Sequence, residues 1–103
     1  MFDVLIINGN LVDGTGKKAS KADIGIIADK IDQIGNLKDA STKKIIDANG
    51  KTLSPGFVDT HAHSDAALLI DPIHENGIRQ GITTEILGQD GLSYAPLSKE
   101  NYL

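Results

Sequence analysis

The chain has 103 residues, enough for one small domain with a modest core and too few for a closed (β/α)₈ barrel of about 250 residues. Hydrophobic residues make up 40% and charged residues 23% of the sequence, a composition typical of globular proteins that excludes disordered and fibrous classes. The net charge is -4, only 4% of residues are aromatic and the lysines are interleaved with aspartates, so no nucleic-acid partner is expected.

The N-terminal run from Val4 to Ile7 is apolar and β-branched, which predicts a first strand. Asn8-Gly9 suits the positive φ angles of a tight turn, so a hairpin returning through residues 10–12 is expected. The apolar run is too short for a signal peptide or a membrane span, and no membrane partner is expected. The absence of cysteine excludes disulfides and zinc–thiolate sites and favours a cytoplasmic location.

Residues 23–28 and 31–34 predict a second strand pair, connected by Asp29-Lys30 and ended by Gly35. Two further short strands are predicted at residues 44–47 and 51–53, on either side of an Asn49-Gly50 turn. Residues 1–54 therefore predict a small β-sheet or sandwich layer, which forms the first domain, and residues 55–103 form the second.

The pattern changes at residues 54–65, which read Ser-Pro-Gly-Phe-Val-Asp-Thr-His-Ala-His-Ser-Asp. Residues 57–63 lack a clean alternation of apolar and polar side chains, as expected of a strand covered on both faces. In such a strand His61 and His63 would project from the same face, with their backbones about 7 Å apart.

A helix is predicted over residues 72–80, with Asp71 as its N-cap and Pro72 in its first turn. Ile73 and Ile78 are expected to face inward, Glu75 and Arg79 are spaced for a surface ion pair, and Gly81 suits the C-terminus. Residues 82–87 predict a strand parallel to the first, and residues 88–96 predict a loop.

The predicted strand–helix–strand unit places three potential metal ligands at one end. The C-terminal ends of parallel strands lie at the same mouth, and His61, His63 and Asp90 each follow or end one of the two strands. Imidazole nitrogen and carboxylate oxygen suit Zn²⁺ and related divalent ions. Two histidines at a strand end also occur as hydrogen-bonded surface residues, so the residue pattern alone leaves both interpretations open.

Residues 54–63 closely resemble the start of the barrel in the amidohydrolase superfamily of metal-dependent hydrolases. The resemblance extends upstream through residues 45–50 (Ile-Ile-Asp-Ala-Asn-Gly) and downstream through residues 79–85 (Arg-Gln-Gly-Ile-Thr-Thr-Glu). Within the superfamily, residues 61–65, the Asp71-Pro72 step and residues 91–96 (Gly-Leu-Ser-Tyr-Ala-Pro) most resemble the N-acyl-D-amino-acid deacylases, or D-aminoacylases.

The resemblance implies a fold and an activity. Residues 1–54 would belong to a small β-domain, and residues 55–103 would form the first βαβ unit of an incomplete (β/α)₈ barrel. The parent protein would bind one or two Zn²⁺ ions through His61 and His63, and a metal-activated water would attack the acyl amide carbonyl of a small N-acyl amino acid. Further ligands and a catalytic aspartate come from later strands in the superfamily, so this fragment alone is expected to be inactive and to self-associate through uncovered apolar surface.

One departure from the family pattern concerns the third ligand. Many members carry a metal-binding cysteine in a Gly-Asn-Cys-Gly turn, where this chain has Gly88-Gln89-Asp90-Gly91. Aspartate also binds zinc, so Asp90 is predicted as a ligand, with a structural role as the alternative.

Other interpretations stay open. A dihydroorotase-like or hydantoinase-like enzyme is the nearest rival, although the dihydroorotase pattern places an arginine where this chain has Asp65. Asp65 is predicted to contact substrate or metal, or to cap backbone amides. Asp59 is predicted to be a structural hydrogen-bonding residue and His74 an exposed residue without a partner. A non-enzymatic β-rich fragment is the alternative of a different class.

Overall fold

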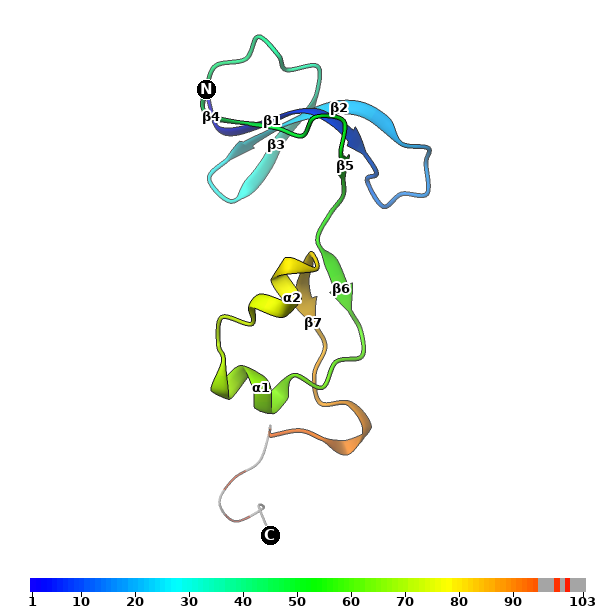
Figure 1. Ribbon diagram of the computed structural model, residues 1–103, viewed down its shortest axis with the longest axis vertical. Coiled ribbons are helices and arrows are strands. Elements are labelled where there is room, and N and C mark those ends of the chain that lie inside the picture. The colour runs from blue at the N-terminus through cyan, green and yellow to red at the C-terminus, as the bar shows by residue number, and fades with distance from the viewer. Residues whose placement is uncertain (95–97, 99, 101–103) are drawn as a thin grey trace. The chain divides into compact units, whose positions relative to one another are not determined.

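The computed structural model describes residues 1–94, 98 and 100. The last two positions of the loop predicted over residues 88–96 therefore lie outside the described residues. The chain divides into two compact units, of which the first spans Met1–Pro55 and the second begins at Gly56 (Figure 1). Among the described residues, no helix is both long enough and apolar enough to cross a membrane.

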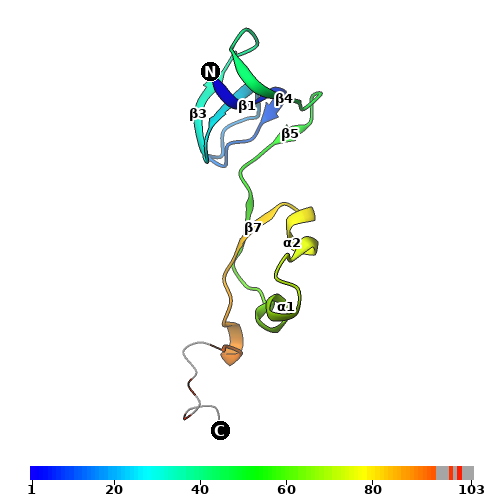
Figure 2. The same cartoon turned by 90° about the vertical axis from the view of Figure 1, so that its left-hand side faces the viewer.

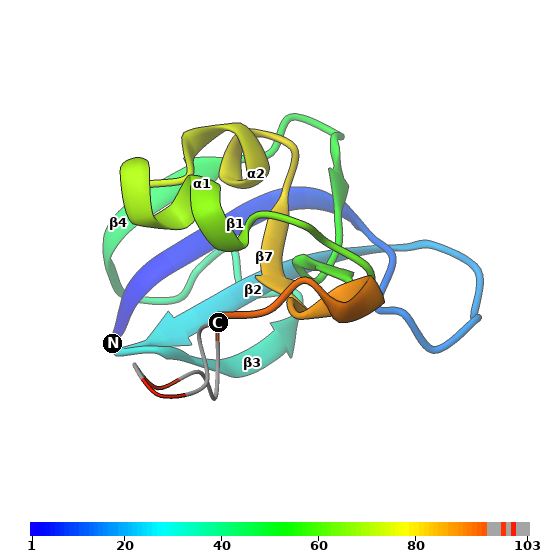
Figure 3. The same ribbon diagram turned by 90° about the horizontal axis from the view of Figure 1, so that it is seen from below.

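The first unit is one mixed β-sheet. Its strands are β1 (Phe2–Leu11), β2 (Ser20–Ile27), β3 (Lys30–Gly35), β4 (Thr42–Asp47) and β5 (Thr52–Leu53). The strand order is β3-β2-β1-β4 (Figure 3). β5 also pairs with β1. β1 is antiparallel to β2 and parallel to both β4 and β5. The β-rich layer predicted for the N-terminal half is confirmed, with β1 as its central strand.

The hairpin predicted at Asn8-Gly9 is wrong, because β1 continues through both residues. Asn8 does have a positive φ of 57°, as a turn residue would. It forms a bulge instead, since the β1–β2 register shifts between Ile6 and Gly9. The Asn8 N–H donates to Asp23 Oδ1 at 2.9 Å, and the Asn8 side-chain amide donates to Asp47 Oδ1 at 3.0 Å. These partners are distant in sequence, which is why a local pattern could not distinguish the bulge from a turn.

The β2–β3 hairpin is confirmed, but its connection lies one residue earlier than predicted. The turn residues are Ala28 and Asp29, and Ala28 has a φ of 53°. The Ala28 N–H donates to Asp3 Oδ2 of β1 at 2.8 Å. This hydrogen bond stabilises the unfavourable positive φ of Ala28. β3 ends at Gly35 as predicted, and the Asn49-Gly50 turn is confirmed, with φ angles of 49° and 74°.

The core of the first unit is small and gathers around β1. Phe2, Leu5 and Leu37 form its buried cluster, and Leu5 is only 1% exposed. Gly25 lies opposite Leu5 in the sheet, and a Cβ atom there would lie 2.5 Å from the Phe2 ring. Glycine therefore leaves the space that the Phe2 ring occupies in the core.

The second unit begins with a parallel strand pair. Its elements are β6 (Phe57–Asp59), α1 (Asp65–Ile70), α2 (Glu75–Arg79), β7 (Ile82–Glu85) and the short 3₁₀ helix η1 (Gln89–Gly91). The parallel pairing of β6 with β7 confirms the prediction. Both α-helices lie on the same side of β7 (Figure 2). Phe57 and Val58 are 59% and 56% exposed, so the expectation of a strand covered on both faces is not met within the described residues.

The helix predicted over residues 72–80 is confirmed only in its second part, because α2 spans Glu75–Arg79, and the preceding helix α1 was not predicted. Asp71 ends α1 by donating its N–H to the Ala67 carbonyl, and its side chain accepts the Ile73 N–H at 3.2 Å in a local turn. Ile78 and Ile73 are 62% and 71% exposed instead of facing inward. The ion pair between Glu75 and Arg79 is confirmed, with Arg79 Nε donating to Glu75 Oε1 at 2.8 Å.

Candidate metal centre

The two histidines lie just past the end of β6, in the connection to α1. The prediction that the strand continues to His63 is wrong, because β6 ends at Asp59. Asp59 Oδ1 accepts the His61 N–H at 3.1 Å, a local turn that leads the chain out of the strand. This bond confirms the structural role predicted for Asp59. His61 is therefore oriented by a turn and not by the alternation of side chains along a strand.

Backbone hydrogen bonds tie this connection to the segment after β7. Ile86 donates its N–H to the Asp59 carbonyl at 2.9 Å, and Ala62 donates its N–H to the Ile86 carbonyl at 3.3 Å. Ala62 is 7% exposed, whereas His61 and His63 on either side of it are exposed. The buried alanine therefore anchors the segment while both imidazole rings reach outward.

Asp90 reaches the same place from the loop after β7. It lies in η1 with a positive φ of 54°, between Gly88 and Gly91, whose φ angles are 78° and 79°. Gln89 holds this turn against the first loop, because its side-chain amide donates to the carbonyls of Ile86 at 3.3 Å and Thr60 at 3.4 Å.

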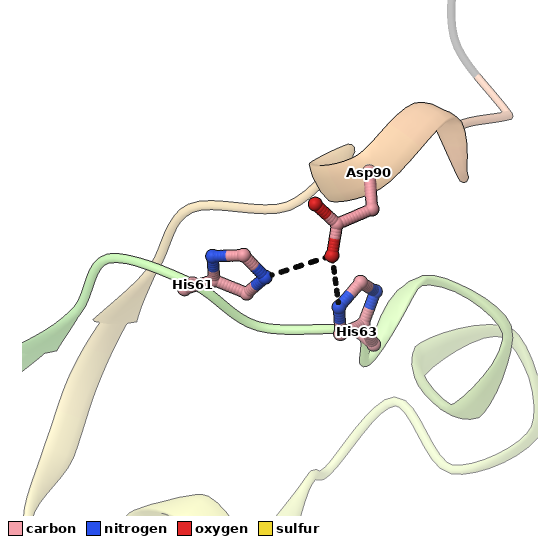
Figure 4. A group of neighbouring side chains, drawn as sticks. All are labelled: His61, His63 and Asp90. Carbon is pink, nitrogen blue, oxygen red and sulfur yellow. Dashed lines mark hydrogen bonds and ion pairs between the residues drawn. The ribbon is translucent and has the colours of Figure 1, made fainter.

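The structure brings His61, His63 and Asp90 into one cluster (Figure 4). Asp90 Oδ2 lies 3.1 Å from His61 Nε2 and 3.4 Å from His63 Nε2. The two rings meet edge to face, with centroids 5.2 Å apart and planes inclined by 66°. One donor atom from each residue lies within 4.8 Å of the others, and the side chains are 57%, 43% and 67% exposed, respectively.

The cluster has the donor chemistry of a zinc site, and two of its three donor separations match a tetrahedral ion. Zn²⁺ binds imidazole nitrogen and carboxylate oxygen at about 2.0–2.2 Å, so neighbouring ligands of a tetrahedral ion lie about 3.3 Å from one another. The two contacts that Asp90 makes with His61 and His63 have this separation. The exposure of all three side chains leaves the remaining coordination positions accessible to water or substrate.

Asp65, the predicted substrate contact, does not join this cluster. It is the first residue of α1 and is partly buried. Together with His63, Ser93 and Tyr94 it lines a cavity of about 240 Å³. Asp65 is therefore placed next to the candidate metal centre and not within its ligand set.

His74 is not the exposed, unpartnered residue that the sequence suggested. Its Nε2 lies 2.6 Å from Glu85 Oε1, and the two side chains are 26% and 12% exposed. The hydrogen bond from His74 is the main cause that lowers the pKa of the Glu85 carboxyl below its usual value. The partners are far apart in sequence and meet only because α2 packs on β7, so no sequence signal indicated the pair.

Comparison with known proteins places the chain in a family. The family model described as the amidohydrolase family matches residues 44–101. The chain therefore belongs to the amidohydrolase family.

Within that family its similarity is to the D-aminoacylases, also called N-acyl-D-amino-acid deacylases. A D-aminoacylase of Alcaligenes xylosoxydans xylosoxydans is 40% identical over 97% of this chain and 21% of the relative. A solved D-aminoacylase with a binuclear metal centre has a TM-score of 0.89 at 40% identity, covering 98% of this chain and 21% of that one.

A second solved relative binds zinc and an inhibitor. The N-acyl-D-glutamate deacylase of Bordetella bronchiseptica, complexed with zinc and a phosphonate that mimics the tetrahedral intermediate, has a TM-score of 0.87 at 38% identity. That match covers 92% of this chain and 20% of the relative. The chain thus spans about a fifth of the length of the relatives it matches.

Proposed function

We propose that the whole protein is a zinc-dependent hydrolase that cleaves the linear acyl amide bond of small N-acyl-D-amino acids. Membership of the amidohydrolase family and 40% identity to a D-aminoacylase over nearly the whole chain support this proposal. The observation that carries it is the convergence of two imidazoles and one carboxylate at the mouth formed by the ends of two parallel strands.

His61, His63 and Asp90 are the residues proposed to hold the metal, as one ion or as part of a pair. When bound, Zn²⁺ lowers the pKa of water and polarises a carbonyl, the two requirements for amide hydrolysis near neutral pH. The imidazoles supply neutral nitrogen donors, and Asp90 supplies the one negative charge of the set. Asp65, beside the cluster, is proposed to contact the substrate from the wall of the adjoining cavity.

The fold around the site supports a barrel assignment for the second unit. β6, the two helices and β7 are proposed to be the first βαβ unit of a (β/α)₈ barrel, with the candidate ligands at its C-terminal face. Residues 1–54 are proposed to be the N-terminal part of the small β-domain, in a protein that acts in the cytoplasm. Because the chain spans about a fifth of the relatives' length, it is proposed to be inactive by itself.

Replacing Asp90 tests the third ligand. The Asp90→Asn variant is expected to bind zinc about 10-fold more weakly or worse, because the neutral amide removes the only anionic donor. Asp90→Cys is expected to restore binding, since a thiolate is an equally good zinc ligand. Calorimetric titration of the chain with zinc measures both, with Asp32→Asn, at an exposed position of β3, as the matched control. Unchanged affinity in Asp90→Asn would assign Asp90 a structural role.

Self-association of the isolated chain is proposed from its exposed apolar side chains. Phe57, Val58 and Ile73 are each more than half exposed in the second unit, and Ile31 and Ile45 are likewise exposed in the first. Size-exclusion chromatography with light scattering is expected to show species larger than a monomer as concentration rises. A clean monomer across the whole concentration range would contradict this.

A cyclic-amide hydrolase is the second candidate for the whole protein. Asp65 stands where the dihydroorotase pattern has an arginine, and an aspartate cannot replace the positive charge of that side chain. The linear substrate is therefore preferred. Assays of the whole protein with an N-acyl-D-amino acid and with a hydantoin distinguish the two, since hydrolysis of the hydantoin alone would favour the cyclic-amide reaction.

A further inference from the structure

We infer that His74 and Glu85 are positioning residues, which fix the strand end from which the two candidate metal-binding loops leave. The His74–Glu85 pair lies outside the cluster of His61, His63 and Asp90. Its effect on zinc affinity rests on the proposed function, whereas its effect on the conformation of the two loops rests on the contacts described below.

The local structure around His74 is shaped to make this contact. His74 precedes α2 in the left-handed conformation, with a φ of 49°, which is unfavourable for a non-glycine residue. Its ring passes over Gly77, where a Cβ atom would lie 2.7 Å from the ring. Glycine weakens so short a helix, yet only glycine leaves room for the ring to reach Glu85. The left-handed backbone of His74 and the glycine within α2 are both locally unfavourable, and both allow the His74–Glu85 contact.

Glu85 depends on that contact. Its side chain is 12% exposed, and Oε1 accepts the hydrogen bond from His74. The Ser64 hydroxyl also helps to lower the pKa of this carboxyl, but it makes no hydrogen bond of ordinary geometry to the buried Oε2. Removing His74 would leave a largely buried carboxylate without its main partner, which is costly in a low-dielectric site.

A short chain of bonds leads from Glu85 to the ligand loops. Glu85 is the last residue of β7 and lies opposite Asp59 in the strand register. The next residue, Ile86, donates its N–H to Asp59 and accepts from Ala62, and Asp59 in turn accepts the His61 N–H. Displacement of the Glu85 backbone would therefore disturb the turn that orients His61.

The same strand end also controls the third ligand. The Ile86 carbonyl accepts a hydrogen bond from the Gln89 side chain, one residue before Asp90. The two ligand loops share Ile86 as their common anchor. A pair that fixes Glu85 thus fixes the separation between the histidines and Asp90.

The test uses the full chain and two readouts. Glu85→Ala and His74→Ala each remove the hydrogen bond, because alanine has no side-chain donor or acceptor. Glu75→Ala is the matched control, since Glu75 is an exposed residue of α2 that pairs with Arg79. In the metal-free chain, amide hydrogen exchange at Ile86 and Ala62 is expected to accelerate severalfold in both variants and to stay unchanged in the control. Calorimetric zinc titration is expected to show about 10-fold weaker binding in both variants, as for other residues that orient metal ligands.

The double variant Glu85→Ala/His74→Ala makes the inference falsifiable. If the pair acts as one unit, the double variant exchanges and binds like either single variant. Additive effects, or unchanged exchange at Ile86 and Ala62, would overturn the inference. If wild-type chain binds no zinc, the proposed function fails, while the exchange measurement still decides the positioning role. If Glu85→Ala unfolds the second unit, His74→Ala, at a more exposed position, supplies the same readouts.

Discussion

Replacing His61 and His63 together by alanine is expected to abolish specific zinc binding by the chain. The two imidazoles supply two of the three donor atoms that lie within 4.8 Å of one another, and a single exposed carboxylate binds zinc too weakly to hold it. Each single replacement is expected to weaken binding by about 10-fold or more, since two donors remain. Calorimetric titration with zinc measures all three variants.

The third histidine provides the internal control for this experiment. His74 remains in the double variant and is engaged with Glu85, so any residual zinc uptake reports adventitious binding elsewhere on the chain. Circular dichroism checks that the sheet of the first unit is intact. Stoichiometric zinc retained by the double variant at wild-type affinity would contradict the assignment of this cluster as the metal centre.

Asp23→Ala is expected to lower the free energy of unfolding of the first unit by about 2–4 kcal/mol. Asp23 is 4% exposed, and its two carboxylate oxygens accept the backbone N–H groups of Asn8 and Leu37, both at 2.9 Å. The first bond closes the bulge in β1, and the second holds Leu37 in the core. Alanine would leave both donors without their partner, at a cost of about 1–3 kcal/mol for the buried Leu37 N–H and about 1 kcal/mol for the part-buried Asn8 N–H.

Urea denaturation followed by circular dichroism measures this loss. Asp32→Ala is the matched control, because Asp32 is an exposed residue of β3 in the same sheet. The control is expected to change stability by less than about 0.5 kcal/mol. Equal stability of the two variants would show that water replaces the Asp23 hydrogen bonds without cost.

Part of the candidate site could be predicted because it depends on topology. The prediction of parallel strands needed only apolar runs separated by a helical segment, and parallel strands place their C-terminal ends together. That rule was enough to expect His61, His63 and Asp90 near one another. It was correct even though β6 ends before His61, because the hydrogen bonds of Asp59 and Ala62 hold the loop along β7.

The features that could not be predicted depend on partners that are distant in sequence. Asn8-Gly9 has the same local preference for positive φ in a hairpin turn and in a bulge, and only Asp23 and Asp47 decide between them. Likewise, the Asp71-Pro72 pattern suits the start of a helix, but Asp71 instead ends α1 and begins a turn. The contact of His74 with Glu85 likewise depends on the packing of α2 on β7, which joins residues eleven positions apart.

The central position of β1 has a consequence for the order in which the first unit folds. β2 and β3 are joined by a two-residue turn and can pair as soon as both are synthesised. β1 can pair with β4 only later, because Phe2 lies opposite Thr42, about forty residues further along the chain. Until then one edge of the first strand is open to pairing with a strand of another nascent chain. Slow translation before β4 would prolong this exposure, so the rate of synthesis and aggregation are linked through β1.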